Sequence, residues 1–505
     1  MNVRAVINVI SALVAVIGLT ILSAVPVSLF MGDSSNDISM MVYSAIAPIV
    51  LGVLGYFTSK SDSYKLGVRE GFGIVTFGWI TASVVGALPY IFIENLYWYD
   101  AFFETMSGFT TTGSSVLERG LNLSDGTTLL NGIADMSRGV IYWRAMTHWL
   151  GGMGIVVLSL AILPFLGIGG QQLYNAEVPG PTSDQLTPKI ANSAKILWSV
   201  YFFMTVVETF LLRLGGMTLF EAWCHTCATL ATGGFSTSQA SVAGFNSPYI
   251  DSVITLFMFL AGCNFILHFR ALRGKPLFYF KDEEFKLYLY ITIAASIILT
   301  FSLYGKQVIT TQGVVIDDTS FLNAFRYSIF QVVSIMTTTG FCTADFNLWP
   351  AYSTLILVAL MFIGGCGGST GGGIKVSRIL LVIKYSISQV ERCLFPRALT
   401  NTRIHNERVD TATLHKVMAF VVIFGGLFFF FALCLTAFEI DLKTALSASV
   451  ASLGNIGPGL EKVGASCTYS WMDPGAKLIL SFAMLLGRLE IYTVLVLFLP
   501  SFWKK

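Results

Sequence analysis

Thr337-Thr338-Thr339-Gly340-Phe341-Cys342-Thr343 directly follows an apolar segment, residues 325–336, that is too short to cross a membrane. The same arrangement of a short apolar segment and a small polar motif occurs at three other places in the chain. The three motifs are Thr110-Thr111-Thr112-Gly113-Ser114 after 102–109, Ala231-Thr232-Gly233-Gly234-Phe235-Ser236-Thr237 after 220–230, and Leu453-Gly454-Asn455-Ile456-Gly457-Pro458-Gly459 after 442–452. When Gly113, Gly234, Gly340 and Gly457 are aligned, the intervals between them are 121, 106 and 117 residues. A recurrence with this period indicates a repeated structural unit.

The composition places the chain in a lipid bilayer. Of its 505 residues, 54% are hydrophobic and only 12% are charged, whereas a soluble domain carries about 25% charged residues. The net charge of +2 gives no reason to expect a nucleic-acid partner. The eight cysteines are scattered, and Cys224 and Cys227 have no second pair at zinc-finger spacing, so we interpret these two as packing residues.

Ten apolar segments are long enough to be spanning helices, because a span needs about 20 residues. They are residues 5–30, 40–58, 71–93, 139–166, 194–212, 249–269, 286–304, 351–383, 416–438 and 476–500. Eight of them flank the four loops in pairs. The predicted fold is an all-α integral membrane protein with ten transmembrane helices and four re-entrant pore loops in pseudo-fourfold parallel repeats. The predicted divisions are an N-terminal two-helix domain over 1–66 and pore repeats over 67–170, 171–276, 277–400 and 401–505.

Basic residues gather in the loops on one side of the predicted helices. They are Lys60, Lys65, Arg69, Arg270, Arg273, Lys275, Lys281, Lys286, Arg392, Arg397, Arg403, Arg408, Lys504 and Lys505. On the other side, the loop over 31–40 has no basic residue and the loop over 213–248 has one. The positive-inside rule therefore predicts that both termini are cytoplasmic.

The four loops have the properties of a cation filter. Non-helical backbone at membrane depth persists only where it is buried or lines water. A half-helix that stops midway points the negative end of its dipole at the membrane centre, which favours a cation. The carbonyl groups of the following strand can then replace the hydration shell of the ion. Glycine suits this strand because it adopts unusual φ values and leaves the pore open, while threonine hydroxyls add ligands or pin the strand.

Residues 364–373 interrupt the eighth predicted span with seven glycines in ten positions. Each glycine costs about 1 kcal/mol relative to alanine inside a helix, so this segment is predicted to be a loop within the membrane. We expect Gly367, Gly368, Ser369, Thr370 and Gly371 to form a gate below the third filter loop. A phosphate-binding loop is excluded, since the only nearby lysine follows isoleucine and precedes valine.

Arg488 lies in the middle of the last predicted span, where a charge is costly unless it is paired or faces water. It either projects below the filter, repelling cations or latching the glycine loop, or it forms a buried salt bridge between helices. We expect Arg144 and His148, one helical turn apart, to be structural. Glu104 and Glu221 are weaker candidates for concentrating cations at the outer mouth.

The four loops resemble those of the Trk/Ktr/HKT superfamily of potassium transporters, in particular its bacterial Trk branch. Two further segments carry this resemblance: Tyr142-Trp143-Arg144-Ala145-Met146-Thr147-His148-Trp149-Leu150-Gly151-Gly152-Met153-Gly154, and Gly364 to Lys375. The resemblance covers nearly the whole chain, including the N-terminal helix pair. It implies that the four aligned glycines surround one axis. It also implies that K⁺ is held by the carbonyl groups of Thr111, Thr112, Thr232, Gly233, Thr338, Thr339, Asn455 and Ile456.

The same resemblance implies further properties of the chain. Plant relatives with serine at the first glycine position favour Na⁺, so Gly113 favours K⁺ here. With one aligned glycine per repeat, the filter is shorter than that of K⁺ channels, and weaker discrimination is expected. The family has a gating loop at the glycine-rich segment, forms homodimers and binds a ring of TrkA-type nucleotide-binding subunits in the cytoplasm. Residues 392–416 are the candidate contact, although positive-inside charge explains that loop equally well.

The predicted function is K⁺ uptake across a bacterial inner membrane, with K⁺ bound only at the filter residues and no cofactor on this chain. No catalytic constellation or nucleotide-binding domain is recognisable, so control by ATP or NAD would require a partner. One alternative is a sodium- or proton-coupled secondary transporter of another small solute, a class that usually shows two broken helices. The other is a membrane scaffold or sensor that transports nothing.

Overall fold

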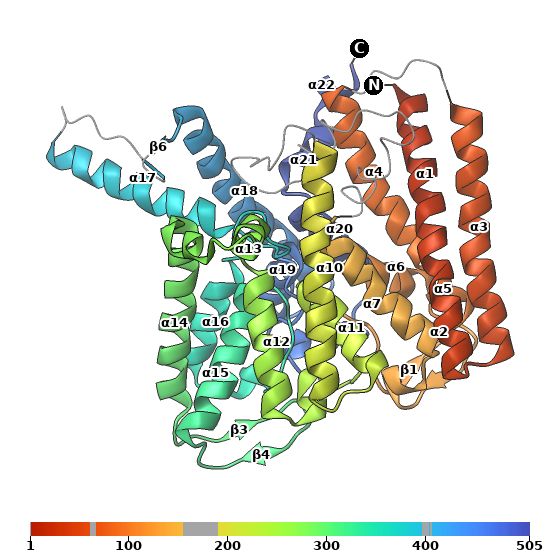
Figure 1. The fold of residues 1–505 in the computed structure, drawn as a ribbon, viewed down its shortest axis with the longest axis horizontal. Helices are drawn as coiled ribbons and strands as arrows, with labels where there is room; N and C mark the ends of the chain where they lie inside the picture. The colour runs from red at the N-terminus through yellow and green to blue at the C-terminus, as the bar shows by residue number, and fades with distance from the viewer. Residues whose placement is uncertain (1, 61–66, 155–189, 396–402, 405–406, 505) are drawn as a thin grey trace.

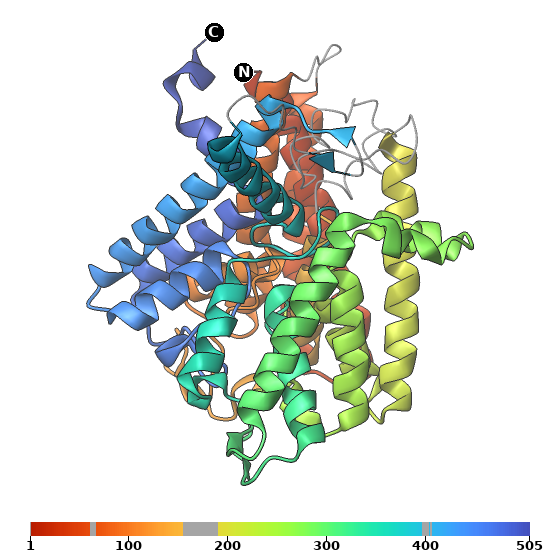
Figure 2. The same ribbon diagram turned by 90° about the vertical axis from the view of Figure 1, so that its left-hand side faces the viewer.

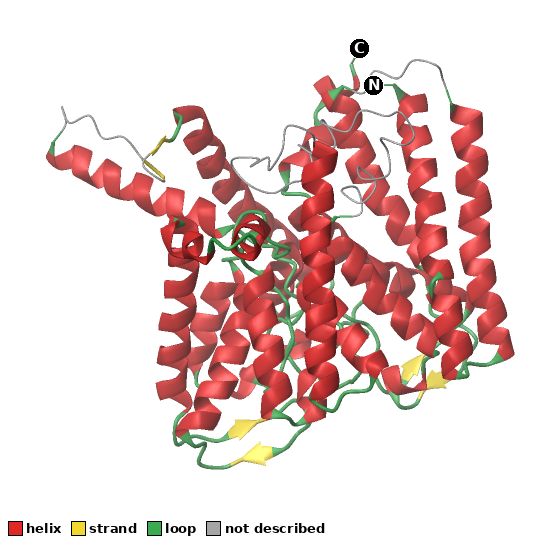
Figure 3. Ribbon diagram, in the orientation of Figure 1, coloured by secondary structure: helices red, strands yellow, loops and turns green. Residues whose placement is uncertain are grey.

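The computed structural model describes residues 2–60, 67–154, 190–395, 403–404 and 407–504. Helices dominate this part of the chain (Figure 3). The strands are three antiparallel two-residue pairs: β1 Leu121–Asn122 with β2 Thr128–Leu129, β3 Val308–Ile309 with β4 Val315–Ile316, and β5 Arg403–Ile404 with β6 Glu407–Arg408. The all-α prediction is confirmed.

The N-terminal pair consists of α1 Val3–Leu22, which continues as α2 Ala24–Met31, and α3 Ser35–Ser59 (Figure 1). A Cβ atom added at Gly52 would lie 2.5 Å from the backbone nitrogen of Ala15. Small residues therefore allow α1 and α3 to pack closely, as is common between membrane helices.

Asp33, in the turn between α2 and α3, connects this pair to the helix α7 Arg138–Gly152. Its carboxylate accepts hydrogen bonds from the backbone N–H groups of Arg138 and Gly139 at 3.0 and 2.9 Å, and from the hydroxyl of Ser137 at 2.8 Å. Burial alone would raise the pKa of Asp33, but hydrogen bonds from Ser28, Gly139, Arg138 and Ser137 hold this pKa below its usual value. Asp33 thus supplies the acceptor that the first turn of α7 lacks.

Most of the remaining helices form four units, each with a middle helix of 12 or 16 residues between two other elements. The units are α4 Val68–Gly86 with α5 Leu88–Phe92, α6 Trp98–Phe109 and α7; α10 Ile190–Leu214, α11 Leu219–Leu230 and α12 Pro248–Ala261; α14 Glu283–Leu303, α15 Phe321–Met336 and α16 Ala351–Met361; and α18 Thr411–Thr436, α19 Leu442–Leu453 and α20 Pro474–Arg488. The short helices α6, α11, α15 and α19, here called the pore helices, end at the four predicted motifs. Both termini lie at one end of the molecule, and the hairpins β1–β2 and β3–β4 lie at the other (Figure 1).

Within the described residues, six helices are long and apolar enough to cross a membrane, and up to eight if two bent pairs each count as one span. The expected span over 139–166 begins as α7, and its second half lies outside the described residues. The expected span over 351–383 is interrupted between α16 and α17 Val376–Leu394, as the glycine-rich segment predicted.

The spans over 249–269 and 476–500, expected to be continuous, are each broken. α12 meets α13 Phe265–Leu272 at 103°, and α13 lies sideways in Figure 2. Asn264 causes this bend by accepting a hydrogen bond from the backbone N–H of Ile266 at 2.9 Å, which starts a new helix. α20 meets α21 Tyr492–Leu495 and the following turn at 112°, because Glu490 and Ile491 have left-handed backbone with φ of 55° and 59°.

Candidate functional site

All four pore helices end in the same hydrogen-bonded turn. The backbone N–H groups of Thr112, Gly233, Thr339 and Ile456 donate to the carbonyl five residues earlier at 2.9, 2.8, 2.8 and 2.8 Å. The preceding residue in each case donates to the carbonyl three residues earlier, at 3.0 to 3.2 Å. This pair of bonds is a Schellman motif, which ends a helix by placing one residue in the left-handed region. The four motifs recognised in the sequence therefore share one backbone conformation.

The left-handed residue is not glycine in any of the four turns. Thr111, Thr232, Thr338 and Asn455 have φ of 54°, 54°, 60° and 55°. Glycine is the usual residue at this position, and a left-handed L-residue costs about 1–2 kcal/mol. Strain of this kind gathers at functional sites, where the side chain is needed. Two of these hydroxyls indeed accept hydrogen bonds, that of Thr338 from the N–H of Gly372 at 2.7 Å and that of Thr111 from Arg488 at 3.1 Å.

The four aligned glycines lie in a closed ring. A Cβ atom added at Gly113 would lie 2.1 Å from the carbonyl oxygen of Gly233, and one at Gly234 would lie 2.1 Å from that of Thr339. A Cβ atom at Gly340 would lie 2.0 Å from the oxygen of Ile456, and one at Gly457 would lie 2.6 Å from that of Thr112. Each repeat thus places its glycine against the carbonyl that precedes the glycine of the next repeat. Four of the eight predicted carbonyl ligands therefore alternate with the glycines around a common centre.

Two small cavities lie near the ring. All four glycines line the first, whose volume is about 100 Å³, together with Ser114, Tyr469 and residues of the loops that follow each motif. This cavity is here called outer, and the other inner, after the orientation that the positive-inside rule predicts. The inner cavity, also about 100 Å³, is lined by the glycine-rich segment, Lys375, Arg488 and Glu490. The ring therefore borders one hollow, and the glycine-rich segment borders the other.

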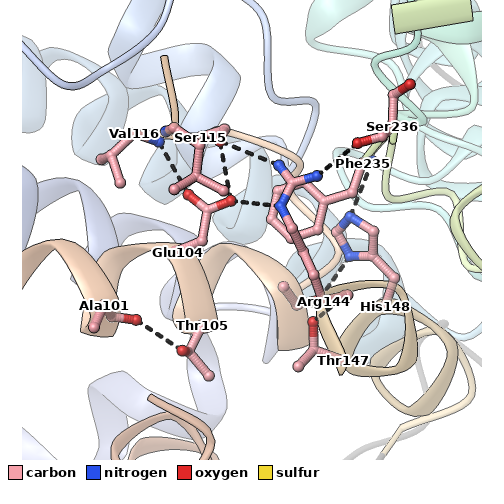
Figure 4. A network of polar contacts seen from close by, with 12 residues as sticks. Ala101, Glu104, Thr105, Ser115, Val116, Arg144, Thr147, His148, Phe235 and Ser236 are labelled. Carbon is pink, nitrogen blue, oxygen red and sulfur yellow. Dashed lines mark hydrogen bonds and ion pairs between the residues drawn. The ribbon is translucent and has the colours of Figure 1, made fainter. Parts of the chain in front are cut away.

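A buried polar network stabilises the outer side of the ring (Figure 4). Arg144 of α7 donates through Nε to Glu104 of α6 at 2.8 Å, through Nη1 to the carbonyl of Ser236 at 3.0 Å, and through Nη2 to the hydroxyl of Ser115 at 3.1 Å. Glu104 also accepts from the N–H of Val116 at 2.9 Å. The guanidinium thus connects the loop after Gly113 to the loop after Gly234.

His148 strengthens the same connection one turn further along α7 (Figure 4). One ring nitrogen lies 2.8 Å from the carbonyl of Gly108, in the last turn of α6. The other accepts a hydrogen bond from the N–H of Phe235 at 3.2 Å. Arg144 and His148 are therefore structural, as expected.

The suggestion that Glu104 concentrates cations at the outer mouth is wrong. Glu104 is fully buried and its charge is paired with Arg144. Glu221 accepts hydrogen bonds from the N–H and hydroxyl of Thr218 at 2.9 and 2.7 Å, which caps the start of α11. Sequence spacing could not show the partner of Glu104, because Arg144 is 40 residues away, whereas the capping box of Thr218 and Glu221 is a local pattern.

Replacement of Arg144 by lysine is expected to destabilise the protein by about 1–3 kcal/mol. Lysine keeps the charge beside Glu104, but its single ammonium group cannot also reach Ser236 and Ser115, and each lost hydrogen bond costs about 0.5–1.5 kcal/mol. Thermal unfolding of the purified protein in detergent measures this loss. Arg138→Lys, on the first turn of the same helix, is the matched control, and equal unfolding temperatures for both variants would contradict the role of Arg144.

The glycine-rich segment 364–373 folds into the bend between α12 and α13. The N–H of Cys366 donates to the carbonyl of Gly262 at 2.8 Å, and the N–H of Phe265 donates to the carbonyl of Gly368 at 3.1 Å. The hydroxyl of Thr370 donates to the carbonyl of Leu230, at the end of α11, at 2.9 Å. The bend leaves backbone N–H and carbonyl groups without partners inside a helix, and the segment supplies hydrogen bonds to them.

The segment also lies directly against the ring. A Cβ atom added at Gly371 would lie 2.9 Å from the carbonyl oxygen of Thr337, and one at Gly372 would lie 2.4 Å from that of Gly454. Glycine is required here because backbone approaches backbone. The glycine-rich segment, including Gly371 of the predicted gate, therefore packs directly against the residues that precede Thr338 and Asn455 of the predicted filter.

Arg488 joins the segment to the ring. Its guanidinium donates to the carbonyl of Thr370 at 2.7 Å, to that of Gly152 at 2.9 Å and to the hydroxyl of Thr111 at 3.1 Å, and it also contacts the carbonyl of Gly151. Of the alternatives considered from the sequence, these contacts favour the latch. Arg488 lies at the end of α20, beside the bend, and not within a continuous span. Glu490 pairs with Arg378 of α17.

The sequence did not identify the role of Lys375, and it identified Asn455 only as a carbonyl ligand, without the contacts of its side chain. The ammonium of Lys375 contacts the carbonyl of Gly371, so a second cation holds the glycine-rich segment. The side-chain amide of Asn455 donates to the hydroxyl of Thr112 at 3.0 Å and to the carbonyl of Met484 at 2.9 Å. The sequence suggested only a possible phosphate-binding role for Lys375. The position of this lysine, two residues after the last glycine of the segment, is the feature that could have indicated its contact with the segment.

Comparison with known proteins agrees with this geometry. The family model described as "TrkH: Cation transport protein" matches residues 38–505. The chain is 38% identical over 509 residues to the Trk system potassium uptake protein TrkH of Escherichia coli (strain K12), with 100% of both chains covered. It is 35% identical over 510 residues to the TrkH protein of Vibrio parahaemolyticus, again with full coverage of both.

A solved structure extends this similarity to three dimensions. The crystal structure of the potassium transporter TrkH from Vibrio parahaemolyticus superimposes with a TM-score of 0.85 at 33% identity, and the match covers 100% of each chain. With the family model covering most of the sequence and relatives that match over their full length, the chain belongs to the TrkH family of cation transport proteins.

Proposed function

We propose that this chain takes up K⁺ across the bacterial inner membrane through the ring of four repeats. The observation that carries the proposal is the closed ring, in which glycines and carbonyl oxygens of successive repeats alternate around one centre. Four pore helices end at this ring, and their C-terminal carbonyl ends favour a cation. Relatives of similar length that match over the whole chain are named potassium uptake proteins.

We further propose a role for each group of predicted site residues. The carbonyl groups of the eight residues predicted above hold the dehydrated ion, and the four glycines keep the passage open. Residues 367–371 obstruct the inner side, with Arg488 as their latch. The repeat boundaries predicted from the sequence, 67–170, 171–276, 277–400 and 401–505, place one filter glycine in each unit.

The cavity volumes argue against an organic solute as the substrate. Pockets for small organic molecules measure about 300–1,000 Å³. Each of the two hollows that lie near the ring measures about 100 Å³. These hollows suit a dehydrated monovalent ion.

The partners that the family resemblance implies are also proposals. Helix α17 projects beyond the helical body at the end where both termini lie (Figure 1). Its apolar residues Ile383, Ile387, Val390 and Leu394 are exposed at helical spacing. An exposed apolar face of this kind supports a contact with a second copy or with TrkA-type subunits. We place both termini and this face in the cytoplasm on the positive-inside rule.

A flux assay tests the proposed function. Purified protein in liposomes is expected to pass K⁺ and Rb⁺ faster than Na⁺, because the ring offers fixed oxygens in place of the hydration shell. Uptake is measured for each cation with and without the cytoplasmic partner, at a fixed K⁺ gradient. Liposomes without protein are the control. Failure to pass any of the three cations in either condition, or saturable uptake of an organic solute alone, would contradict the proposal.

A further inference from the structure

A single carboxylate connects two parts of the predicted gate to the helical body. Glu284 is the second residue of α14, the first helix of the third repeat. Its Oε1 accepts a hydrogen bond from the backbone N–H of Gly367 at 2.6 Å and another from that of Ser377 at 2.8 Å. These donors are 83 and 93 residues away along the chain. One belongs to the glycine-rich segment and the other to the first turn of α17.

The hydrogen bond to Ser377 replaces a missing helix cap. The first N–H groups of any helix lack partners within the helix. Lys375 occupies the N-cap position of α17, and its side chain makes no capping hydrogen bond. The carboxylate of Glu284 supplies the acceptor, and a negative charge there also interacts favourably with the helix dipole. Glu284 therefore fixes the point at which α17 begins.

The hydrogen bond from the N–H of Gly367 to Glu284 fixes the glycine-rich segment itself. Gly367 and Ser377 are brought to the same oxygen atom, so the nine residues between the two donors must fold back on themselves. The N–H of Gly364 donates to the carbonyl of Ile374 at 2.9 Å, and that of Val376 donates to the carbonyl of Gly365 at 3.1 Å, which closes the base of this fold. Arg488 holds the tip at Thr370. The segment is therefore held at its tip by the fourth repeat and at its base by α14.

We propose that Glu284 is a positioning residue of the gate, which holds the glycine-rich segment in the obstructing conformation and couples it to the start of α17. This inference rests on the proposed function. Movement of α17 by a partner changes the position of Ser377, and the shared carboxylate transmits this change to Gly367. Arg488 and Glu284 act on the same segment from opposite sides, so loss of either releases it.

Replacement of Glu284 tests the inference in the full-length protein in liposomes without the cytoplasmic partner. Glu284→Ala is expected to raise Rb⁺ uptake about tenfold, while the ratio of Rb⁺ to Na⁺ uptake stays within twofold of the unchanged protein. Glu284→Gln keeps one acceptor oxygen without the charge and is expected to raise uptake less, by about threefold. A residue that merely supported the fold would lower uptake or change the ion ratio when removed, and would not raise uptake at constant ratio.

Glu283→Ala is the matched control. Glu283 precedes Glu284 on α14 and pairs with Lys384 of α17, so its removal deletes a neighbouring negative charge and an ion pair to α17, while both hydrogen bonds of Glu284 remain. Its uptake is expected to stay within twofold of the unchanged protein. Unchanged or lower uptake by both Glu284 variants, while Arg488→Ala conducts, would overturn this inference alone. If no variant and no unchanged protein passes any cation, the proposed function itself fails. Should Glu284→Ala not fold, the Gln variant decides in the same way.

Discussion

Replacement of Gly113 by alanine is expected to reduce Rb⁺ uptake in liposomes at least about 100-fold. The Cβ atom would lie 2.1 Å from the carbonyl oxygen of Gly233, a distance that no carbon and oxygen adopt without a bond. That oxygen belongs to the backbone of the neighbouring repeat, so it cannot rotate away as a side chain would. Gly113 also has φ of 81°, where an L-residue costs about 1–2 kcal/mol. The carbonyl must move, and one ligand of the ion is lost.

A control separates the clash from the backbone strain. Gly216, in the turn before α11, has φ of 100°, and a Cβ atom there would meet nothing within 4 Å. Gly216→Ala therefore introduces the same kind of backbone strain without a steric clash. Rb⁺ uptake by this variant is expected to stay within twofold of the unchanged protein. Uptake by Gly113→Ala above about a tenth of the unchanged rate, in folded protein, would show that the ring does not form the passage.

Replacement of Arg488 by alanine is expected to raise Rb⁺ uptake through the chain alone at least about tenfold. The guanidinium holds Thr370 of the gate and Thr111 of the ring at 2.7 and 3.1 Å. Hydrogen bonds from a charged group contribute about 1.5–3 kcal/mol each, and about 1.4 kcal/mol corresponds to a factor of ten in an equilibrium. Loss of these contacts therefore shifts the segment substantially towards the released conformation. The same substitution removes a positive charge, and repulsion of K⁺ by that charge is the alternative cause of a closed passage.

Arg488→Lys separates these two causes. Lysine keeps the charge but cannot donate to Thr370, Thr111 and two glycine carbonyls at once. If repulsion closes the passage, this variant stays closed; if the latch closes it, uptake rises nearly as much as for alanine. We expect the second result, because the contacts are with neutral oxygens of the segment and the ring. Unchanged or lower uptake by Arg488→Ala, in a protein that still folds, would count against the latch.

The fold class and the repeats were predictable because their signals are local. A short apolar helix followed by a left-handed turn and a glycine depends on a dozen consecutive residues, and four copies of such a pattern identify a repeat. The interruption at 364–373 was predictable for the same reason, since seven glycines in ten positions cannot form a stable helix. The bends at Asn264 and Glu490 were missed, because one or two residues produce them without changing the hydropathy of the segment.

The sequence by itself thus determined that this chain is an all-α membrane protein with four equivalent loops, and it aligned the four glycines of the ring, while the family resemblance implied the carbonyl ligands. Only the tertiary structure decided which groups those residues meet. Glu104 is neutralised by Arg144, 40 residues away, Gly367 is held by Glu284, 83 residues away, and Thr111 is held by Arg488, 377 residues away. Hydrogen bonds between such distant groups depend on how the repeats pack around one centre, and no periodicity along the chain records that packing.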